Sequence, residues 1–149
     1  MKNQVILFLV LCASFSSFGQ ILTPVTWSTA VEKLDDSTYK LVSTASIDSG
    51  WHLYSQTVPK KGPVPTLFEY NGIGEGFELI EATKEEEGHT VNDPVFKMTI
   101  TYFEDSARFE QLVRVTDKNL KKIEGFVEFM ACDNSRCLPP TEVDLAFEL

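Results

Sequence analysis

Hydrophobic and polar residues alternate with a period of two along most of this chain. The alternation is clearest at the carboxyl end, where one face carries Val143, Leu145, Phe147 and Leu149 and the other carries Glu142, Asp144, Ala146 and Glu148. Successive side chains of a strand point to opposite faces, so this period indicates β-strands with one buried face. No window of the sequence sustains the spacing of an amphipathic helix. We expect the last strand to pack its apolar side on a core.

Similar runs predict further strands, separated by short segments of turn-forming residues. The expected strands cover residues 27–34, 39–48, 66–70, 77–83, 96–103, 108–116, 124–132 and 142–149. Eight or nine short strands of this kind are typical of an all-β domain. The prediction is a single antiparallel β-sandwich of immunoglobulin-like kind, with a small barrel as the alternative. The charged run at residues 84–87 is expected in a solvated loop.

The amino terminus has the composition of a secretory signal peptide. Lys2 gives a positive start, residues 5–18 are almost all apolar or small, and a small-x-small cleavage site ends at Gly19. We expect residues 1–19 to be removed and residues 20–149 to form one mature domain. The apolar run is too short to span a bilayer comfortably, so no stable membrane insertion is expected.

Cys12 could suggest a lipoprotein signal, but Leu11 stands before it where such signals require a small residue. Lipidation is therefore not the favoured reading. Removal of the signal peptide also removes Cys12, which leaves two of the three cysteines in an oxidising compartment.

The overall charge is acidic, with 13 Lys and Arg against 22 Asp and Glu and a net charge of −9. Loss of Lys2 leaves 12 basic residues, so the mature chain carries 12 − 22 = −10. Such a surface disfavours nucleic acid and anionic membranes as partners. The acidity is read as a contribution to solubility, and we expect a monomer.

The two remaining cysteines, Cys132 and Cys137, have four residues between them and precede Pro139-Pro140. A disulfide between them would close a ring of about six residues and stabilise by about 2 kcal/mol on the chain-entropy estimate. Such a bridge constrains only a short segment of the chain. A strained or exposed bridge also exchanges readily with thiols. Because turn-forming residues lie between two predicted strands here, we expect a hairpin tip or a loop.

The charges beside the two thiols differ. Arg136 favours a thiolate at Cys137, whereas Asp133 disfavours one at Cys132. Cys137 is therefore expected to be the better nucleophile.

These residues resemble a known family. Residues 132–140, with Phe129-Met130-Ala131 before them and Thr141-Glu142-Val143 after them, look like the active-site region of the amino-terminal periplasmic domain of the thiol:disulfide interchange protein DsbD. Two further segments are similar to parts of that family, namely Gly50-Trp51-His52-Leu53-Tyr54-Ser55-Gln56 and Asp93-Pro94-Val95-Phe96. The resemblance covers most of the mature chain and again implies an immunoglobulin-like sandwich, located in the periplasm.

The resemblance implies an electron relay without a cofactor. The family receives two electrons from a membrane-embedded thiol-disulfide transporter, by way of a thioredoxin-like domain, and passes them to oxidised partner proteins, with a link to cytochrome c biogenesis. Cys137 matches the cysteine that forms the mixed disulfide, and Cys132 matches the resolving one. This chain would then be a stand-alone component of a protein-disulfide reductase, with donor and acceptor on separate proteins.

Two departures from the family pattern concern the site itself. Four residues separate the cysteines here instead of five, and residues 85–90, where an aromatic cap is expected, contain neither Phe nor Tyr. His89 and Phe96 are the candidates for a cap. The residues expected to line the site are Trp51, Tyr54, His89, Asp133, Arg136 and Pro139.

Two alternatives from other classes remain open at this point. The chain could be a secreted binding module whose Cys132–Cys137 bridge is merely structural. It could also hold copper or zinc through both thiolates and His52 or His89, although these histidines have no recognisable ligand spacing. A measured reduction potential and a metal titration would distinguish these alternatives from the relay.

Overall fold

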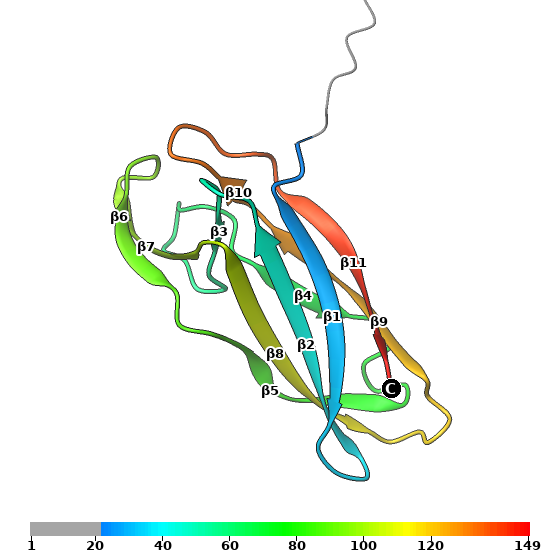
Figure 1. Ribbon diagram of the computed structural model, residues 1–149. Coiled ribbons are helices and arrows are strands. Elements are labelled where there is room, and N and C mark those ends of the chain that lie inside the picture. Colours follow the sequence, from blue (N-terminus) through cyan, green and yellow to red (C-terminus); the bar gives the residue numbers. More distant parts are fainter. Residues whose placement is uncertain (1–21) are drawn as a thin grey trace, which may run out of the picture.

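The computed structural model describes residues 22–149, which form an all-β protein without helices (Figure 1). The expected signal peptide and Cys12 lie outside the described residues. In this part of the chain, no helix long and apolar enough to cross a membrane is found. The strands are β1 (Val25–Lys33), β2 (Thr38–Ile47), β3 (His52–Tyr54), β4 (Leu67–Tyr70), β5 (Phe77–Glu85), β6 (His89–Asp93), β7 (Met98–Phe103), β8 (Ser106–Val115), β9 (Lys122–Phe129), β10 (Ala131–Cys132) and β11 (Thr141–Glu148).

The strands form three antiparallel sheets that together make an immunoglobulin-like sandwich. Their strand orders are β1-β2-β8-β5, β11-β9-β4 and β10-β3-β7-β6. Trp27 of β1 shows how the first two sheets pack, because its ring lies 5.7 Å from Phe68, 5.8 Å from Phe109 and 5.6 Å from Phe129. The hydroxyl of Thr29 also donates a 2.7 Å hydrogen bond to the carbonyl of Ala146, which ties β1 to β11. The predicted sandwich is confirmed, and the barrel alternative is not.

The alternation expected for the last strand is also confirmed. Leu145 and Phe147 of β11 are buried in the main core, with Val143 and Leu149 partly buried beside them. The residues of the opposite face, Glu142, Asp144, Ala146 and Glu148, are all exposed.

Strands β3 and β10 of the small sheet β10-β3-β7-β6 are buried on both faces, and this property positions the site. Leu53, Phe103 and Ala131 pair across β3, β7 and β10 and point into the main core. Their neighbours in sequence point to the other face, where Tyr54, Ile100 and Cys132 form a second, separate apolar cluster. Loops at this end of the sandwich, opposite the carboxyl terminus, carry the cysteine hairpin (Figure 1).

Several element predictions need correction. The strand expected at 124–132 breaks at Met130 into β9 and β10, since β10 leaves its partner in one sheet and pairs with β3 in another. The short strands β3 and β6 were not predicted. The charged run at 84–87 is not wholly a loop, because Lys84 and Glu85 still belong to β5, and Glu85 accepts hydrogen bonds from Ser55 Oγ and the Gln56 amide.

Candidate functional site

Cys132 and Cys137 form a disulfide at the tip of a tight hairpin, as expected from their position between two strands. Their sulfur atoms are 2.00 Å apart and their Cα atoms 4.0 Å apart. The two residues face each other as an isolated antiparallel bridge, flanked by backbone hydrogen bonds from Asp133 N to Arg136 O and from Leu138 N to Ala131 O, both 2.9 Å. Residues directly opposite each other in such a pair share one side of the hairpin, which brings the sulfurs together.

Asp133 holds the turn of this hairpin in shape. Its Oδ1 accepts hydrogen bonds from the Ser135 amide at 2.8 Å, the Ser135 hydroxyl at 2.9 Å and the Arg136 amide at 2.8 Å. These backbone donors, that of Ser135 first, lower the pKa of the Asp133 carboxyl. A short polar side chain that bonds the backbone two and three residues ahead is a common way to fix a tight turn.

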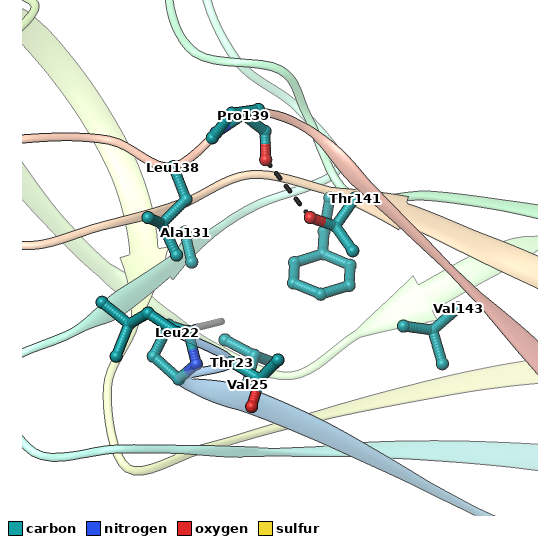
Figure 2. A pocket seen from close by; sticks show the side chains of 10 residues that line it. Leu22, Thr23, Val25, Ala131, Leu138, Pro139, Thr141 and Val143 are labelled. Atoms are coloured by element: carbon teal, nitrogen blue, oxygen red, sulfur yellow. Dashed lines mark hydrogen bonds between the residues drawn. The ribbon is translucent and has the colours of Figure 1, made fainter. Parts of the chain in front are cut away.

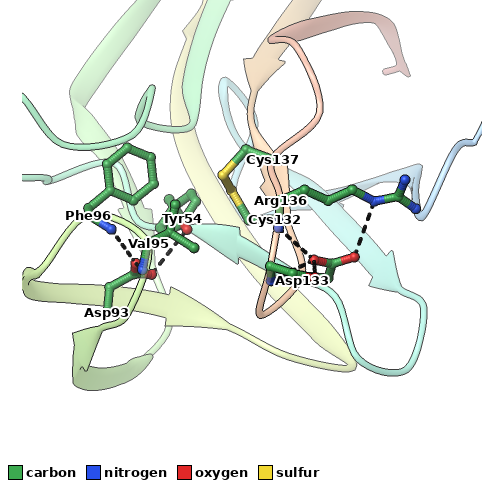
Figure 3. The surroundings of a disulfide bond; sticks show 9 residues. Tyr54, Asp93, Val95, Phe96, Cys132, Asp133, Arg136 and Cys137 are labelled. Atoms are coloured by element: carbon green, nitrogen blue, oxygen red, sulfur yellow. Dashed lines mark hydrogen bonds and ion pairs between the residues drawn. A yellow bond between two sulfur atoms is a disulfide. The ribbon is translucent and has the colours of Figure 1, made fainter.

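Arg136 pairs with Asp133 inside the turn (Figure 3) and also contacts Trp51 outside it. Its Nε lies 3.4 Å from Asp133 Oδ2, and its guanidinium carbon lies 5.8 Å from the centre of the Trp51 ring. This distance is within the range of a cation–π contact, which is worth about 0.5–1 kcal/mol at an exposed site. Trp51 itself packs against the main core, so it anchors the hairpin through Arg136.

The two cysteine residues differ in exposure. Cys132 is 0% exposed, whereas Cys137 is partly exposed. A thiolate from another protein can therefore reach Cys137 Sγ more easily than Cys132 Sγ.

Cys132 lies in the second apolar cluster, together with Tyr54 and Ile100. Partly buried side chains close this cluster, namely Val58, Phe96, Met98, Tyr102, Met130 and Cys137. The sulfur of Cys132 is consequently shielded by side chains from β3, β7 and the turn between β6 and β7.

The turn between β6 and β7 is fastened to the cluster by one buried carboxylate, Asp93. Its Oδ1 accepts hydrogen bonds from the amides of Val95 and Phe96, both 2.8 Å, and its Oδ2 accepts one from the Tyr54 hydroxyl at 3.2 Å. The Phe96 ring then meets the Tyr54 ring edge-on at 5.9 Å (Figure 3). Burial, together with the nearby Asp93 carboxylate, raises the pKa of Tyr54, so its hydroxyl stays protonated and can donate.

His52 lies directly across the strand pair from Cys132, in register. It is 5% exposed, its ring stacks on Tyr102 at 4.6 Å and meets Tyr54 edge-on at 5.5 Å. Burial lowers the pKa of His52, and the carboxylates of Asp93, Glu104 and Asp133 oppose that shift more weakly. His89 is exposed on β6 and approaches the same Tyr102 ring at 6.3 Å.

The reverse side of the hairpin contributes to an apolar pocket (Figure 2). Ala131, Leu138 and Pro139 line it from the hairpin, facing Leu22 and Val25 at the beginning of the described chain. The Thr141 hydroxyl bonds the Pro139 carbonyl at 3.2 Å and fixes the exit from the hairpin. The disulfide is thus presented on one side of a hairpin whose other side rests on the start of β1.

The chain matches the family model described as "Thiol:disulfide interchange protein DsbD, N-terminal" over residues 21–148. It belongs to the family of DsbD amino-terminal domains. Its biochemical activity is therefore thiol-disulfide interchange, and the Cys132–Cys137 disulfide is the group in the structure that fits this chemistry. No curated protein matches the sequence.

Solved structures agree on the fold of this DsbD amino-terminal domain. The reduced DsbD amino-terminal domain of Neisseria meningitidis is similar with a TM-score of 0.56 and 14% identity, over 86% of this chain and 90% of that one. The amino-terminal periplasmic domain of ScsB from Proteus mirabilis gives 0.55 and 13%, over 87% and 50%. A complex of the DsbD and PilB amino-terminal domains from Neisseria meningitidis gives 0.55 and 13%, over 85% and 87%.

In this DsbD domain, most of the residues expected to line the site lie near the disulfide. Tyr54 shares the cluster with Cys132, Asp133 and Arg136 form the turn, and Trp51 supports Arg136. Pro139 lies on the reverse side of the hairpin. His89 approaches the ring of Tyr102, which in turn packs against the cluster that contains Cys132. Residues 85–90 do not form a capping loop, because Glu85 ends β5 and His89 begins β6.

Sequence reasoning missed Asp93 and Tyr102 as parts of the site and considered His52 only as a metal ligand. A signal for Asp93 was available, since Asp followed by Pro indicates a turn and the segment Asp93-Pro94-Val95-Phe96 was already noted. Within residues 22–149, no three His, Cys, Asp or Glu side chains are grouped in a way that could hold a metal ion.

Proposed function

We propose that this domain relays two electrons between partner proteins, with Cys137 as the cysteine that forms the mixed disulfide and Cys132 as the resolving cysteine. The observation that carries the proposal is the difference in exposure within one disulfide, since Cys137 is partly exposed and Cys132 fully buried. Exchange requires in-line access of an attacking thiolate to one sulfur, and the partly exposed Cys137 is the better candidate for such an approach.

The reduction of the domain then proceeds through two successive exchanges. A donor thiolate attacks Cys137 Sγ, a new disulfide forms between donor and Cys137, and the bond to Cys132 breaks with its electron pair left on Cys132. A second donor thiol resolves the mixed disulfide and leaves both cysteines reduced. Oxidation by an acceptor disulfide follows the same steps in reverse, with Cys137 attacking the acceptor and Cys132 releasing it.

The proposed partners are thioredoxin-like proteins, with a membrane thiol-disulfide transporter as the source of electrons. Support comes from the family and from the Neisseria complex of DsbD and PilB amino-terminal domains. We further propose that residues 1–19 act as a cleaved signal peptide, that residues 20–149 work in the periplasm, and that the electrons serve cytochrome c biogenesis. A mass measurement of the exported protein, showing a chain that begins at Gln20, tests the export part.

Trapping tests the assignment of the two cysteines. Cys132→Ala should form a stable disulfide-linked complex with a thioredoxin-like domain whose own resolving cysteine is removed and whose remaining cysteine carries thionitrobenzoate as a mixed disulfide. Attack by Cys137 then releases thionitrobenzoate, and the complex is visible by non-reducing electrophoresis. Cys137→Ala is the matched control and should form little complex, since the remaining thiol is buried. Equal trapping by both variants, or trapping by Cys137→Ala alone, would overturn the assignment.

A further inference from the structure

The resolving step needs a group that removes a proton from a buried thiol. Cys132 is 0% exposed, so in the mixed disulfide its thiol is shielded from water and from solvent bases. Burial disfavours the thiolate, yet the thiolate is the form that attacks a disulfide. The domain must therefore supply a proton acceptor inside the second apolar cluster, or resolve slowly.

His52 stands where such an acceptor is needed. It is paired in register with Cys132 across β3 and β10. Side chains directly opposite each other in an antiparallel pair lie on the same face with Cβ atoms about 4.5–5.5 Å apart. Both residues also pack at Tyr54, His52 through an edge-on ring contact and Cys132 within the same cluster.

The imidazole has an unused nitrogen in the oxidised domain. Within the described part of the chain, His52 Nε2 is buried and has no hydrogen-bond partner. A disulfide sulfur carries no proton to share with it, whereas a reduced Cys132 carries one. Reduction thus creates a proton donor at the residue directly opposite His52 in the strand pair.

We propose that His52 accepts the proton of Cys132 when Cys132 resolves the mixed disulfide, an inference that rests on the proposed roles of the two cysteines. The proton passes from Cys132 Sγ to the imidazole, and the resulting thiolate attacks Cys137 Sγ. The Cys132–Cys137 bond forms, the bond from Cys137 to the partner breaks, and the electron pair leaves on the partner's sulfur. The imidazolium then returns its proton to solvent.

The groups around His52 keep its imidazole neutral and able to accept a proton from Cys132. Tyr54 and Tyr102 pack against its ring, and the carboxylates of Asp93, Glu104 and Asp133 face it from three other segments. Across Tyr102, His89 is the next ionisable group. Burial outweighs the carboxylates and lowers the pKa of His52, so the ring is neutral and able to accept a proton at neutral pH.

A stopped-flow experiment with the reduced domain and one equivalent of 5,5′-dithiobis(2-nitrobenzoate) isolates this step. Attack by Cys137 releases the first thionitrobenzoate, and ring closure by Cys132 releases the second. In His52→Phe, which keeps a ring to stack on Tyr102, the second release should slow about 100-fold or more between pH 6 and 7, the lower end of the usual range for general base catalysis. The first release should be unchanged. The difference in the second rate should narrow near pH 10, because a larger fraction of the Cys132 thiol is then ionised without help from a neighbouring base.

His52→Tyr serves as a second variant with an aromatic ring that is not basic, and it should behave as His52→Phe does. His89→Phe is the matched control and should close its ring as fast as the original domain. Equal closure rates at every pH, or slowing that persists unchanged to pH 10, would overturn the role of His52 and leave the cysteine roles intact. Absence of the first release would instead overturn the proposed function.

Discussion

The hydroxyl of Tyr54 donates a 3.2 Å hydrogen bond to Oδ2 of Asp93, and both side chains are buried although 39 residues separate them. This bond ties β3, which lies beside the cysteine hairpin, to the turn that carries Phe96. Because Asp93 also orders the amides of Val95 and Phe96, one carboxylate links the packing around Cys132 to the shape of that turn.

Tyr54→Phe should lower the free energy of unfolding by about 1–3 kcal/mol, because it leaves a buried carboxylate with one donor fewer. Urea denaturation of the oxidised domain measures this loss. Tyr39→Phe is the matched control, since Tyr39 is half-buried on β2 away from the site, and it should change stability by less than about 0.5 kcal/mol. Equal effects of the two substitutions would show that the hydrogen bond to Asp93 contributes nothing measurable.

Phe96→Ala should speed reduction of the disulfide by dithiothreitol. The ring packs on the cluster that contains both cysteines. If this packing stabilises the closed position of the turn by about 1 kcal/mol, its loss raises the fraction of molecules with an accessible disulfide about fivefold. Val95→Ala lies in the same turn but removes a side chain that is 38% exposed, so it should leave the rate nearly unchanged. A shield at Phe96 is contradicted if both variants are reduced at the original rate.

Asp133→Asn should weaken the pH dependence of stability in the acid range. The hydrogen bonds in the turn lower the pKa of Asp133 in the folded domain below its unfolded value of about 4. Its carboxylate therefore stabilises the fold at pH values above the unfolded pKa, and this contribution disappears as the pH falls through the folded pKa. Asparagine keeps an acceptor oxygen but has no charge to lose.

Thermal unfolding between about pH 2 and pH 5 measures this difference. The Tm of Asp133→Asn should rise less across the range than the Tm of the original domain. Asp144→Asn removes an equal charge from an exposed position on β11 and serves as the control. If the two variants show the same pH dependence, the turn does not depend on the ionised form of Asp133.

Gly125→Ala should destabilise the domain by about 1–3 kcal/mol, the usual range for overpacking. A Cβ at this position of β9 would collide with the backbone carbonyl oxygen of Glu69 just before Tyr70, where β4 passes closely. Backbone cannot move aside as a flexible side chain can. Urea denaturation measures the loss, and a variant as stable as the original domain would contradict the close approach of β4 and β9.

The long strands and the sandwich were predictable because their alternation is local. In β11, burial of Leu145 and Phe147 follows directly from a period of two. The short strands β3, β6 and β10 were not predicted as separate strands, since so few residues show little alternation, although β4, with four residues, was predicted. The break at Met130 also depends on which sheet each half of the segment joins, and that is set by distant strands.

The cysteine pair could be found from the sequence, but its surroundings could not be found in full. Cys132 and Cys137 are close in sequence, and Asp133 and Arg136 lie between them. Phe96 and Tyr102, which help to bury Cys132, come from segments at least 30 residues away that fold back beside it. His52 lies directly across from Cys132 because of the register between β3 and β10, and no local sequence pattern reveals that register.

The reduction potential of the Cys132–Cys137 pair tests the central claim most directly. Equilibration of the domain in dithiothreitol or glutathione buffers, with the fraction of free thiols measured by alkylation and mass spectrometry, gives this value. An interchange domain should have a potential between about −180 and −270 mV, the range of proteins that exchange dithiols with thioredoxin-like partners. A potential well below about −300 mV would identify a structural disulfide and contradict the relay.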